Sequence, residues 1–286
     1  MRHLMRPVLR QALLRGLRPV RLSHDPSRLL WGEGVAELRT LRLTGARGQQ
    51  LAAWLALPGN AAANDPVPVV VALHGWGANA STLSPMVAPL VRAGMAVLLF
   101  DATNHGQSSS EDFSSLPRFA EDLAAVRACL REMPSLDATR CALLGHSVGA
   151  AAVLLHAARH DDVRAVVSLS AFVHPAEVMA RWLREHRIPL RGIGTAILDE
   201  VQQTIGARFE HIAPVHVMAQ LRCPLMLVHG QQDEVVPPSD AQRLHAQAPH
   251  AELLVVEGGH DLREALQPHT PRLVRFLADH LGARKP

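Results

Sequence analysis

Ser147 lies in the sequence Gly145-His146-Ser147-Val148-Gly149, between a short apolar run and an alanine-rich run. A buried strand that turns sharply into a helix has this pattern. The turn strains the backbone at the serine, so the residues two positions to either side must be very small, and both are glycine. The hydroxyl then projects above the strand end, where the start of the helix directs free N–H groups at developing negative charge. The pattern predicts a nucleophilic serine, although a plain tight turn is the alternative interpretation of this motif taken alone.

A serine hydroxyl is a poor nucleophile unless a base takes its proton, and that base needs an orienting acid. His260 follows the last expected strand, and Asp233 follows the strand before it. The order nucleophile, acid, base along the chain is typical of one particular fold. We therefore predict that Ser147, Asp233 and His260 are the catalytic residues. Asp101 also ends an expected strand, but it precedes the serine, and we expect it to be a structural hydrogen-bonding residue.

The oxyanion of an acyl-transfer reaction needs preorganised donors. Val148 N–H at the start of the helix is one candidate, and Trp76 N–H in His74-Gly75-Trp76-Gly77 is the second. A simple strand-ending turn is the alternative interpretation of that loop. His74 and His146 are candidate substrate-binding residues, although the elbow would turn the His146 side chain away from the serine. None of the 17 histidines forms an H-E-x-x-H or similar pair, so we expect no metal site.

The elements that must position these residues alternate between strand and helix. A hairpin is expected at 35–43 and 50–57, followed by strands at 69–73, 95–100, 140–144, 163–169, 224–228 and 252–256 and by helices at 81–93, 113–132 and 271–281. The later strands are apolar on both faces, which is typical of strands between two layers of helices. We predict an α/β fold with a mostly parallel central sheet of about eight strands and helices on both faces. Right-handed crossovers would then bring the carboxyl ends of the parallel strands, and their loops, to one edge.

One segment interrupts this alternation. Between Phe172 and Cys223 there is no clear strand, but helical patterns occur at 177–186 and 195–204. We interpret residues 173–222, approximately, as a small helical lid inserted in an α/β domain that spans residues 34–286. Met179 and Trp182 are candidate substrate-binding residues in this lid, and they suggest an apolar acyl group. The alternative, that the apolar residues only hold the lid together, stays open.

Residues 1–33 form a distinct N-terminal segment with apolar residues at helical spacing and interspersed arginines. An uninterrupted apolar core and a small-residue cleavage site, which a secretory signal requires, are not evident. One interpretation is a basic amphipathic helix that contacts the inner face of an anionic membrane peripherally. The other is a terminal helix that packs on the domain or is partly frayed.

The composition excludes several classes of protein. The chain has 286 residues, of which 48% are hydrophobic and 19% charged, as in ordinary globular proteins. The formal charge is only +3, tyrosine is absent, and no basic run is interleaved with aromatic residues, so we expect no nucleic-acid partner. Three widely spaced cysteines favour free thiols in a reducing compartment. No apolar run reaches membrane-spanning length, and we expect a cytoplasmic location.

Five motifs together resemble the α/β-hydrolase superfamily, and the similarity is greatest to its esterase, lipase and serine-aminopeptidase-like members. They are Gly145-His146-Ser147-Val148-Gly149, His74-Gly75-Trp76-Gly77, Asp101-Ala102-Thr103-Asn104-His105-Gly106-Gln107-Ser108, Gly230-Gln231-Gln232-Asp233 and Gly259-His260. The resemblance implies the serine–aspartate–histidine triad, a two-amide oxyanion hole, a helical cap after the sixth strand and no cofactor. Many members have arginine where Thr103 or Asn104 stands here. Haloalkane dehalogenases and epoxide hydrolases of the superfamily have aspartate at the elbow, and Ser147 argues against both.

These residues predict a serine hydrolase that cleaves carboxylic esters through an acyl-enzyme, with a carboxylesterase or lipase activity (EC 3.1.1). The expected ligand is a small-molecule ester or acyl substrate with an apolar acyl group. The same triad would serve an acyltransferase, a thioesterase, an amidase or peptidase, or a perhydrolase, because all of them share the acyl-enzyme. A non-catalytic binding protein with this fold is the alternative from another class.

Overall fold

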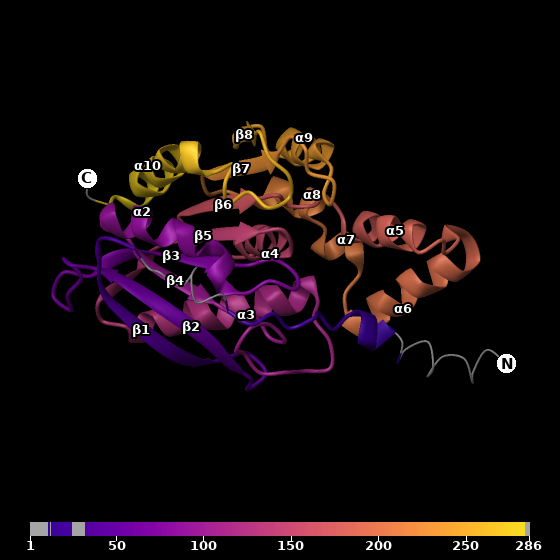
Figure 1. The fold of residues 1–286 in the computed structure, drawn as a ribbon, viewed down its shortest axis with the longest axis horizontal. Coiled ribbons are helices and arrows are strands. Elements are labelled where there is room, and N and C mark those ends of the chain that lie inside the picture. The colour runs from indigo at the N-terminus through magenta and orange to yellow at the C-terminus, as the bar shows by residue number, and fades with distance from the viewer. Residues whose placement is uncertain (1–10, 12, 25–31, 284–286) are drawn as a thin grey trace.

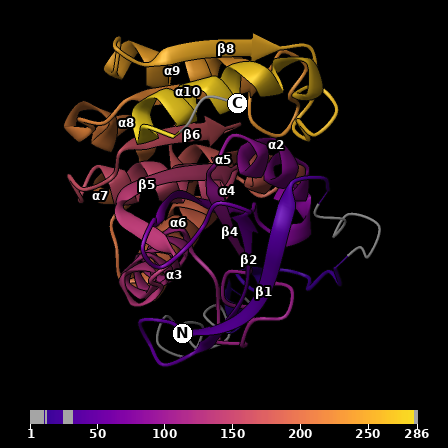
Figure 2. The same ribbon diagram turned by 90° about the vertical axis from the view of Figure 1, so that its left-hand side faces the viewer.

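An eight-stranded sheet forms the centre of the computed structural model, which describes residues 11, 13–24 and 32–283. The strands lie in the order β1-β2-β4-β3-β5-β6-β7-β8 (Figures 1 and 2). Their bounds are β1 (Val35–Thr44), β2 (Gln50–Pro58), β3 (Val67–Leu73), β4 (Ala96–Phe100), β5 (Leu136–His146), β6 (Ala165–Leu169), β7 (Leu225–Gly230) and β8 (Glu252–Val256). The pairs β1–β2 and β2–β4 are antiparallel, and the other five are parallel. The predicted α/β fold with a mostly parallel sheet is confirmed.

Helices cover both faces of the sheet. The helical elements are η2 (Ala80–Met86), α2 (Val87–Arg92), α3 (Leu116–Cys129), η3 (Leu130–Glu132), α4 (Val148–Ala157), α5 (Pro175–Glu185), η4 (Leu190–Gly194), α6 (Thr195–Ile205), α7 (Phe209–Ile212), α8 (Pro214–Val217), η5 (Met218–Gln220), α9 (Pro238–Gln247), η6 (Gln267–His269) and α10 (Thr270–Leu281). Helices α3, α4, α8 and α9 contribute to the hydrophobic core on one face, and η2, α2 and α10 contribute to the core on the other.

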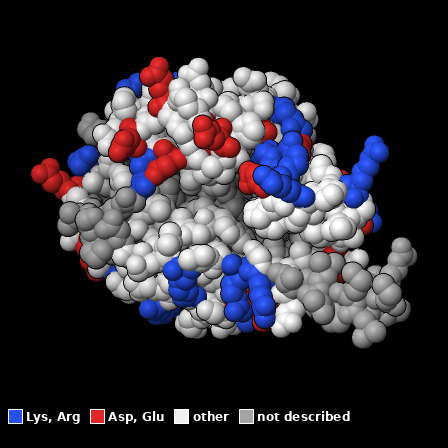
Figure 3. Space-filling model, turned by 45° about the vertical axis from the view of Figure 1, so that its right-hand side comes forward, with Lys and Arg blue, Asp and Glu red and all other residues white. Residues whose placement is uncertain are grey.

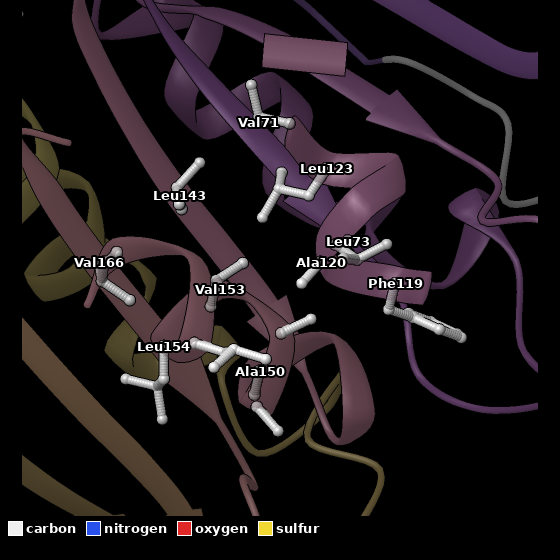
Figure 4. Close-up of a cluster of buried hydrophobic side chains, with 14 of the residues drawn as sticks. Val71, Leu73, Phe119, Ala120, Leu123, Leu143, Ala150, Val153, Leu154 and Val166 are labelled. Atoms are coloured by element: carbon white, nitrogen blue, oxygen red, sulfur yellow. The ribbon is translucent and has the colours of Figure 1, made fainter. Parts of the chain in front are cut away.

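The apolar strands fill both cores because successive side chains point to opposite faces. In β3, Val69, Val71 and Leu73 belong to one core, whereas Val70 and Ala72 belong to the other. Figure 4 shows the first of these cores, in which side chains of α3 and α4 meet side chains of β3, β5 and β6. This two-sided burial is the reason that the central strands read as continuous apolar runs.

Several element boundaries differ from those expected. The helix expected from residue 113 begins at Leu116, because Ser115 caps it by accepting a hydrogen bond from Arg118 N–H. Strand β5 begins at Leu136, before the apolar run, because its first residues pair with Val67 and Pro68 of β3. Helix α9, which lies between β7 and β8, was not expected from the sequence.

The region between β6 and β7 is helical, as its sequence pattern predicts, and α5, η4 and α6 extend away from the sheet (Figure 1). We refer to residues 175–205 as the α5–α6 segment. Leu183, Ile197 and Val201 anchor it in the core, and Arg243 of α9 forms an ion pair with Glu177 of α5. Its role as a lid stays a prediction.

The N-terminal segment is described only in part. Residues 11 and 13–16 are helical, and Leu13 and Leu17 pack against the core. Residues 1–10, which carry much of the predicted amphipathic helix, lie outside the described residues, and a membrane contact there stays a prediction. No helix within the described ranges is long and apolar enough to cross a membrane. The three cysteines are free thiols, as predicted.

Candidate active site

The turn between β5 and α4 places Ser147 at the edge of the sheet where the parallel strands end. Ser147 has φ 56° and ψ −119°, a strained conformation for a residue with a side chain. Its N–H donates to Leu169 O at 2.8 Å. A Cβ at Gly145 would lie 2.4 Å from Gly149 O, and a Cβ at Gly149 would lie 2.3 Å from Leu73 O. Neither position can accept a side chain, so the two glycines allow α4 to lie directly against the sheet.

Loops after β7 and β8 bring the other two predicted residues to Ser147. His260 Nε2 lies 3.0 Å from Ser147 Oγ, and His260 Nδ1 lies 2.8 Å from Asp233 Oδ2. The N–H groups of Val235 and Val236 donate to Asp233 Oδ1 at 2.9 and 2.8 Å and fix the carboxylate. Since a carboxylate only accepts, the His260 proton lies on Nδ1, and Nε2 is free to accept the proton of the serine hydroxyl. The structure thus joins Ser147, His260 and Asp233 in one hydrogen-bonded chain.

Asp233 is buried, but its neighbours keep the carboxyl group ionised. Burial alone would raise the pKa of this carboxyl group, but the His229 ring 3.4 Å away and the hydrogen bonds from His260 and Val236 N–H outweigh that effect. The net result is a pKa well below the usual range. Asp233 is therefore a permanent acceptor for His260 Nδ1–H at neutral pH, the condition an orienting acid must meet.

The loop of residues 74–77, called the oxyanion loop below, runs beside the serine. A Cβ at Gly75 would lie 3.1 Å from Ser147 Cβ, so the backbone leading to Trp76 N–H passes close to the Ser147 side chain. The Trp76 side chain is 41% exposed. Val148 begins α4 directly after the serine. The structure therefore places the backbone of both predicted donors next to Ser147, and their oxyanion-binding role stays a prediction.

His74 does not fit the expected substrate contact. It is fully buried, its Nδ1–H donates to Gly75 O at 2.7 Å, and its Nε2 accepts from Ala102 N–H at 3.0 Å. Burial lowers the pKa of His74 in spite of nearby Asp101, which raises it. The neutral ring therefore ties the oxyanion loop to the chain after β4 and has no free polar atom for a ligand.

His146 supports the loop that carries His260, and its contact with a substrate stays a prediction. Its Nε2–H donates to the His260 carbonyl oxygen at 2.8 Å, and the two rings lie 4.9 Å apart. Burial and the neighbouring His260 lower the pKa of His146 to about 4, so the ring is neutral at pH 7. Its hydrogen-bond donor is used by the loop that carries His260, beside a cavity of about 90 Å³ that Leu83, Met86 and Leu262 also line.

The two lid candidates lie on α5. Met179 packs partly buried against the core, whereas Trp182 is 47% exposed and stacks on His186 at a ring distance of 4.1 Å. Within the described part of the chain, no hydrogen bond or ring contact joins either of them to Ser147 or His260. Their substrate-binding role stays a prediction. The face toward the α5–α6 segment is hollowed, with arginine side chains on both sides of the hollow (Figure 3).

Three histidines of this region were not identified from the sequence. His229 of β7 is buried, and its Nε2–H donates to Val236 O at 2.9 Å and lies 3.4 Å from Asp233 Oδ2. His105 Nε2 accepts from Gly77 N–H at 3.1 Å, and His24 Nε2–H donates to Asp101 Oδ2 at 2.7 Å. A polar residue at the end of an apolar strand could have indicated His229. No local pattern marks His24.

Asp101 is the structural hydrogen-bonding residue that the sequence predicts. It is fully buried and accepts hydrogen bonds from Ala80 N–H, Gln107 N–H and His24. Asn104 is also buried, and its side chain accepts from Glu111 N–H and donates to Ser114 Oγ inside the loop. Within the described ranges, no group of three His, Cys, Asp or Glu side chains is placed to hold a metal ion.

This sheet, with an elbow serine and acidic and histidine residues on later loops, is the fold of the α/β-hydrolases. Residues 64–203 match the family model described as "serine aminopeptidase, S33". The esterase YjfP of Escherichia coli (strain K12) is 28% identical over 228 residues, which cover 76% of this chain and 90% of that protein. The Pyrococcus furiosus esterase Pf2001 superposes with a TM-score of 0.72 at 20% identity over 93% of this chain and 98% of that one. Est1E of Butyrivibrio proteoclasticus, solved with ferulic acid bound, superposes with a TM-score of 0.67 at 22% identity. The match covers 85% of this chain and 99% of that one.

The chain belongs to the α/β-hydrolase superfamily. It is an esterase-like hydrolase of that superfamily.

Proposed function

We propose that the protein is a serine hydrolase that cleaves carboxylic esters through an acyl-enzyme. The observation that carries this proposal is the hydrogen-bonded chain from Ser147 Oγ through His260 to Asp233, with distances of 3.0 and 2.8 Å. These distances lie within the range in which a base can take a proton from a nucleophile. The similarity to an esterase over three quarters of the chain supports ester hydrolysis in particular.

In the proposed reaction, His260 Nε2 takes the proton of Ser147 as Oγ attacks the ester carbonyl carbon. Trp76 N–H and Val148 N–H stabilise the oxyanion of the tetrahedral intermediate, and Asp233 stabilises the imidazolium. His260 then gives the proton to the leaving alcohol, and the acyl group remains on Ser147. A water molecule, deprotonated by His260, attacks the acyl-enzyme and releases the acid.

The substrate that we propose is a small carboxylic ester with an apolar acyl group. Trp76 and Val235 are 41% and 60% exposed, and each lies in a loop that carries part of the proposed machinery. Trp182 adds a third exposed apolar side chain, on α5. Apolar side chains exposed near a polar reaction centre are typical of sites for apolar ligands.

The test is the Ser147→Ala variant with p-nitrophenyl esters of graded acyl length. We expect hydrolysis to fall to the background rate and labelling by a fluorophosphonate probe to disappear, while the circular dichroism spectrum is unchanged. Ser239→Ala, which changes an exposed serine of α9, is the matched control and should retain activity and labelling. Retained turnover in Ser147→Ala would contradict the mechanism. Product analysis with water, alcohol, amine and thiol acceptors separates hydrolysis from acyl transfer.

A further inference from the structure

Residues 13–24, called the N-terminal strap below, run along the loop after β4. Leu17 O accepts from Ser114 N–H at 2.8 Å. Arg21 donates from Nη1 to Gly106 O at 2.9 Å and to Ser108 O at 2.7 Å, and from Nη2 to Ser110 Oγ at 2.9 Å. The strap therefore contacts the 101–114 region through both its backbone and its side chains.

His24 fixes the end of the strap inside the protein. Its side chain is only 5% exposed, its ring lies 4.6 Å from the ring of Trp54, and its Nε2–H donates to Asp101 Oδ2 at 2.7 Å. Burial alone would raise the pKa of Asp101, but the hydrogen bonds from His24 and from Gln107 N–H oppose this, and the pKa lies below its usual value. Asp101 is therefore an ionised, fully buried carboxylate whose side-chain partner comes from the strap.

The oxyanion loop depends on the same region of the chain. Ala102 N–H donates to His74, Gly77 N–H donates to His105, and Ala80 N–H donates to Asp101 Oδ1 at 2.8 Å. Burial and nearby His74 lower the pKa of His105 to about 3, so its Nε2 stays a neutral acceptor for Gly77 N–H at neutral pH. Residues 74–80 are thus held at three points by residues 101–105.

The strap also holds the chain after the oxyanion loop directly. Asn79, two residues after Gly77, donates from Nδ2 to Leu22 O at 3.2 Å and to Ser23 O at 3.1 Å. Its Oδ1 accepts from Ser81 N–H and Ser81 Oγ and so caps η2. Asn79 therefore joins the strap to the first turn after the loop that carries Trp76 N–H.

We propose that the N-terminal strap positions the oxyanion loop and that His24 is a positioning residue for the reaction. The proposal rests on the proposed function, because it assigns to the strap the placement of Trp76 N–H. His24 acts through Asp101 and touches no reacting atom. Because oxyanion donors must lie at a fixed distance from the developing charge, a small shift of residues 74–77 lowers the rate without preventing substrate binding.

The test compares His24→Ala, His24→Gln and Asn79→Asp with the full-length wild type. We expect His24→Ala to lower kcat for p-nitrophenyl butyrate on the order of tenfold, with KM within twofold. Its Ki for a trifluoromethyl ketone, which forms an oxyanion adduct with serine, should rise by a similar factor. His24→Gln, which can still donate to Asp101, should recover much of the loss.

Asn79→Asp removes the two donors to the strap but retains the cap of η2. We expect it to lower kcat and raise Ki as His24→Ala does.

Rates are expressed per active site, counted by fluorophosphonate titration, so that loss of folded protein does not appear as loss of kcat. His250→Ala, which changes an exposed histidine before β8, is the matched control and should behave as wild type. Unchanged kcat and Ki in folded His24→Ala would overturn the proposal, as would a fall in kcat with an unchanged Ki. If His24→Ala does not fold, the kcat and Ki of Asn79→Asp test the proposal in the same way. Absence of labelling in the wild type would instead contradict the proposed function.

Discussion

The elbow at Ser147 and the α5–α6 segment lie in the same domain but are built in different ways. Every residue from Val148 to Ala157 is buried, and glycines at 145 and 149 are required by backbone atoms less than 3 Å away. In α5, by contrast, Leu183 is the one buried residue, and Trp182 and Ile193 of the segment are exposed. The elbow is held by the packing of the whole sheet, whereas the segment is held by a few anchors. We therefore expect local opening of the segment at much lower free energy than opening of the elbow.

The largest expected effect is on activity and separates the two regions most clearly. Asp233→Asn should lower kcat by roughly 10⁴-fold, because asparagine cannot hold His260 in the tautomer that leaves Nε2 free to accept. Asp199→Asn, a matched change of an exposed aspartate on α6, should alter kcat by less than about twofold. Steady-state kinetics with a p-nitrophenyl ester, together with circular dichroism, provide the measurement. A similar loss in both variants would show that the segment takes part in the chemistry.

The second effect is on stability. Gly149→Ala should cost about 3 kcal/mol or prevent folding, because its Cβ would lie 2.3 Å from the rigid backbone oxygen of Leu73. Gly192→Ala in η4 meets no atom within 4 Å and is strained only by its backbone angles (φ +76°, ψ −91°), so we expect a smaller loss of about 1–2 kcal/mol. Urea unfolding curves measure both. Equal losses would mean that the segment is packed as tightly as the elbow.

Contacts between residues close in the chain, or at the common edge of the parallel strands, could be predicted from the sequence, whereas other contacts between distant segments could not. Steric demands on Gly145 and Gly149 act between residues close in the chain or on a neighbouring strand, so the motif together with the apolar and alanine-rich runs that flank it indicated the elbow. Asp233 and His260 could be found because parallel strands end at one edge. The contact of His24 with Asp101 joins residues 77 positions apart, and no periodicity or spacing encodes it. The expected substrate contact of His74 is wrong, because sequence position beside the site does not reveal that both of its ring nitrogens bond backbone groups. For His146 the sequence likewise does not reveal that Nε2 bonds a backbone carbonyl oxygen.

A third, smaller effect concerns acid stability near the elbow. The folded pKa of His146 is about 4, below the value of about 6.5 in an unfolded chain. The unfolded state therefore binds more protons between these values, and the free energy of unfolding falls as the pH is lowered from about 6.5 to about 4. In His146→Gln this part of the fall should disappear, while the buried His105 and His156, with pKa values of about 3, still contribute. Urea midpoints at pH 7 and pH 5 provide the test, and an unchanged difference in the variant would contradict it.

The smallest expected effect tests how the α5–α6 segment is attached. Arg243 of α9 donates two hydrogen bonds, of 2.8 and 2.9 Å, to Glu177 of α5. Both side chains are more than 40% exposed, so the pair should contribute less than about 1 kcal/mol in spite of its bidentate geometry. A double-mutant cycle with Glu177→Gln and Arg243→Gln, measured by urea unfolding, gives this coupling free energy.

Limited proteolysis of the same variants should show faster cleavage in residues 186–194, because local opening needs less free energy than global unfolding. A coupling free energy above about 2 kcal/mol would mean that the segment and the elbow differ less in their attachment than burial indicates.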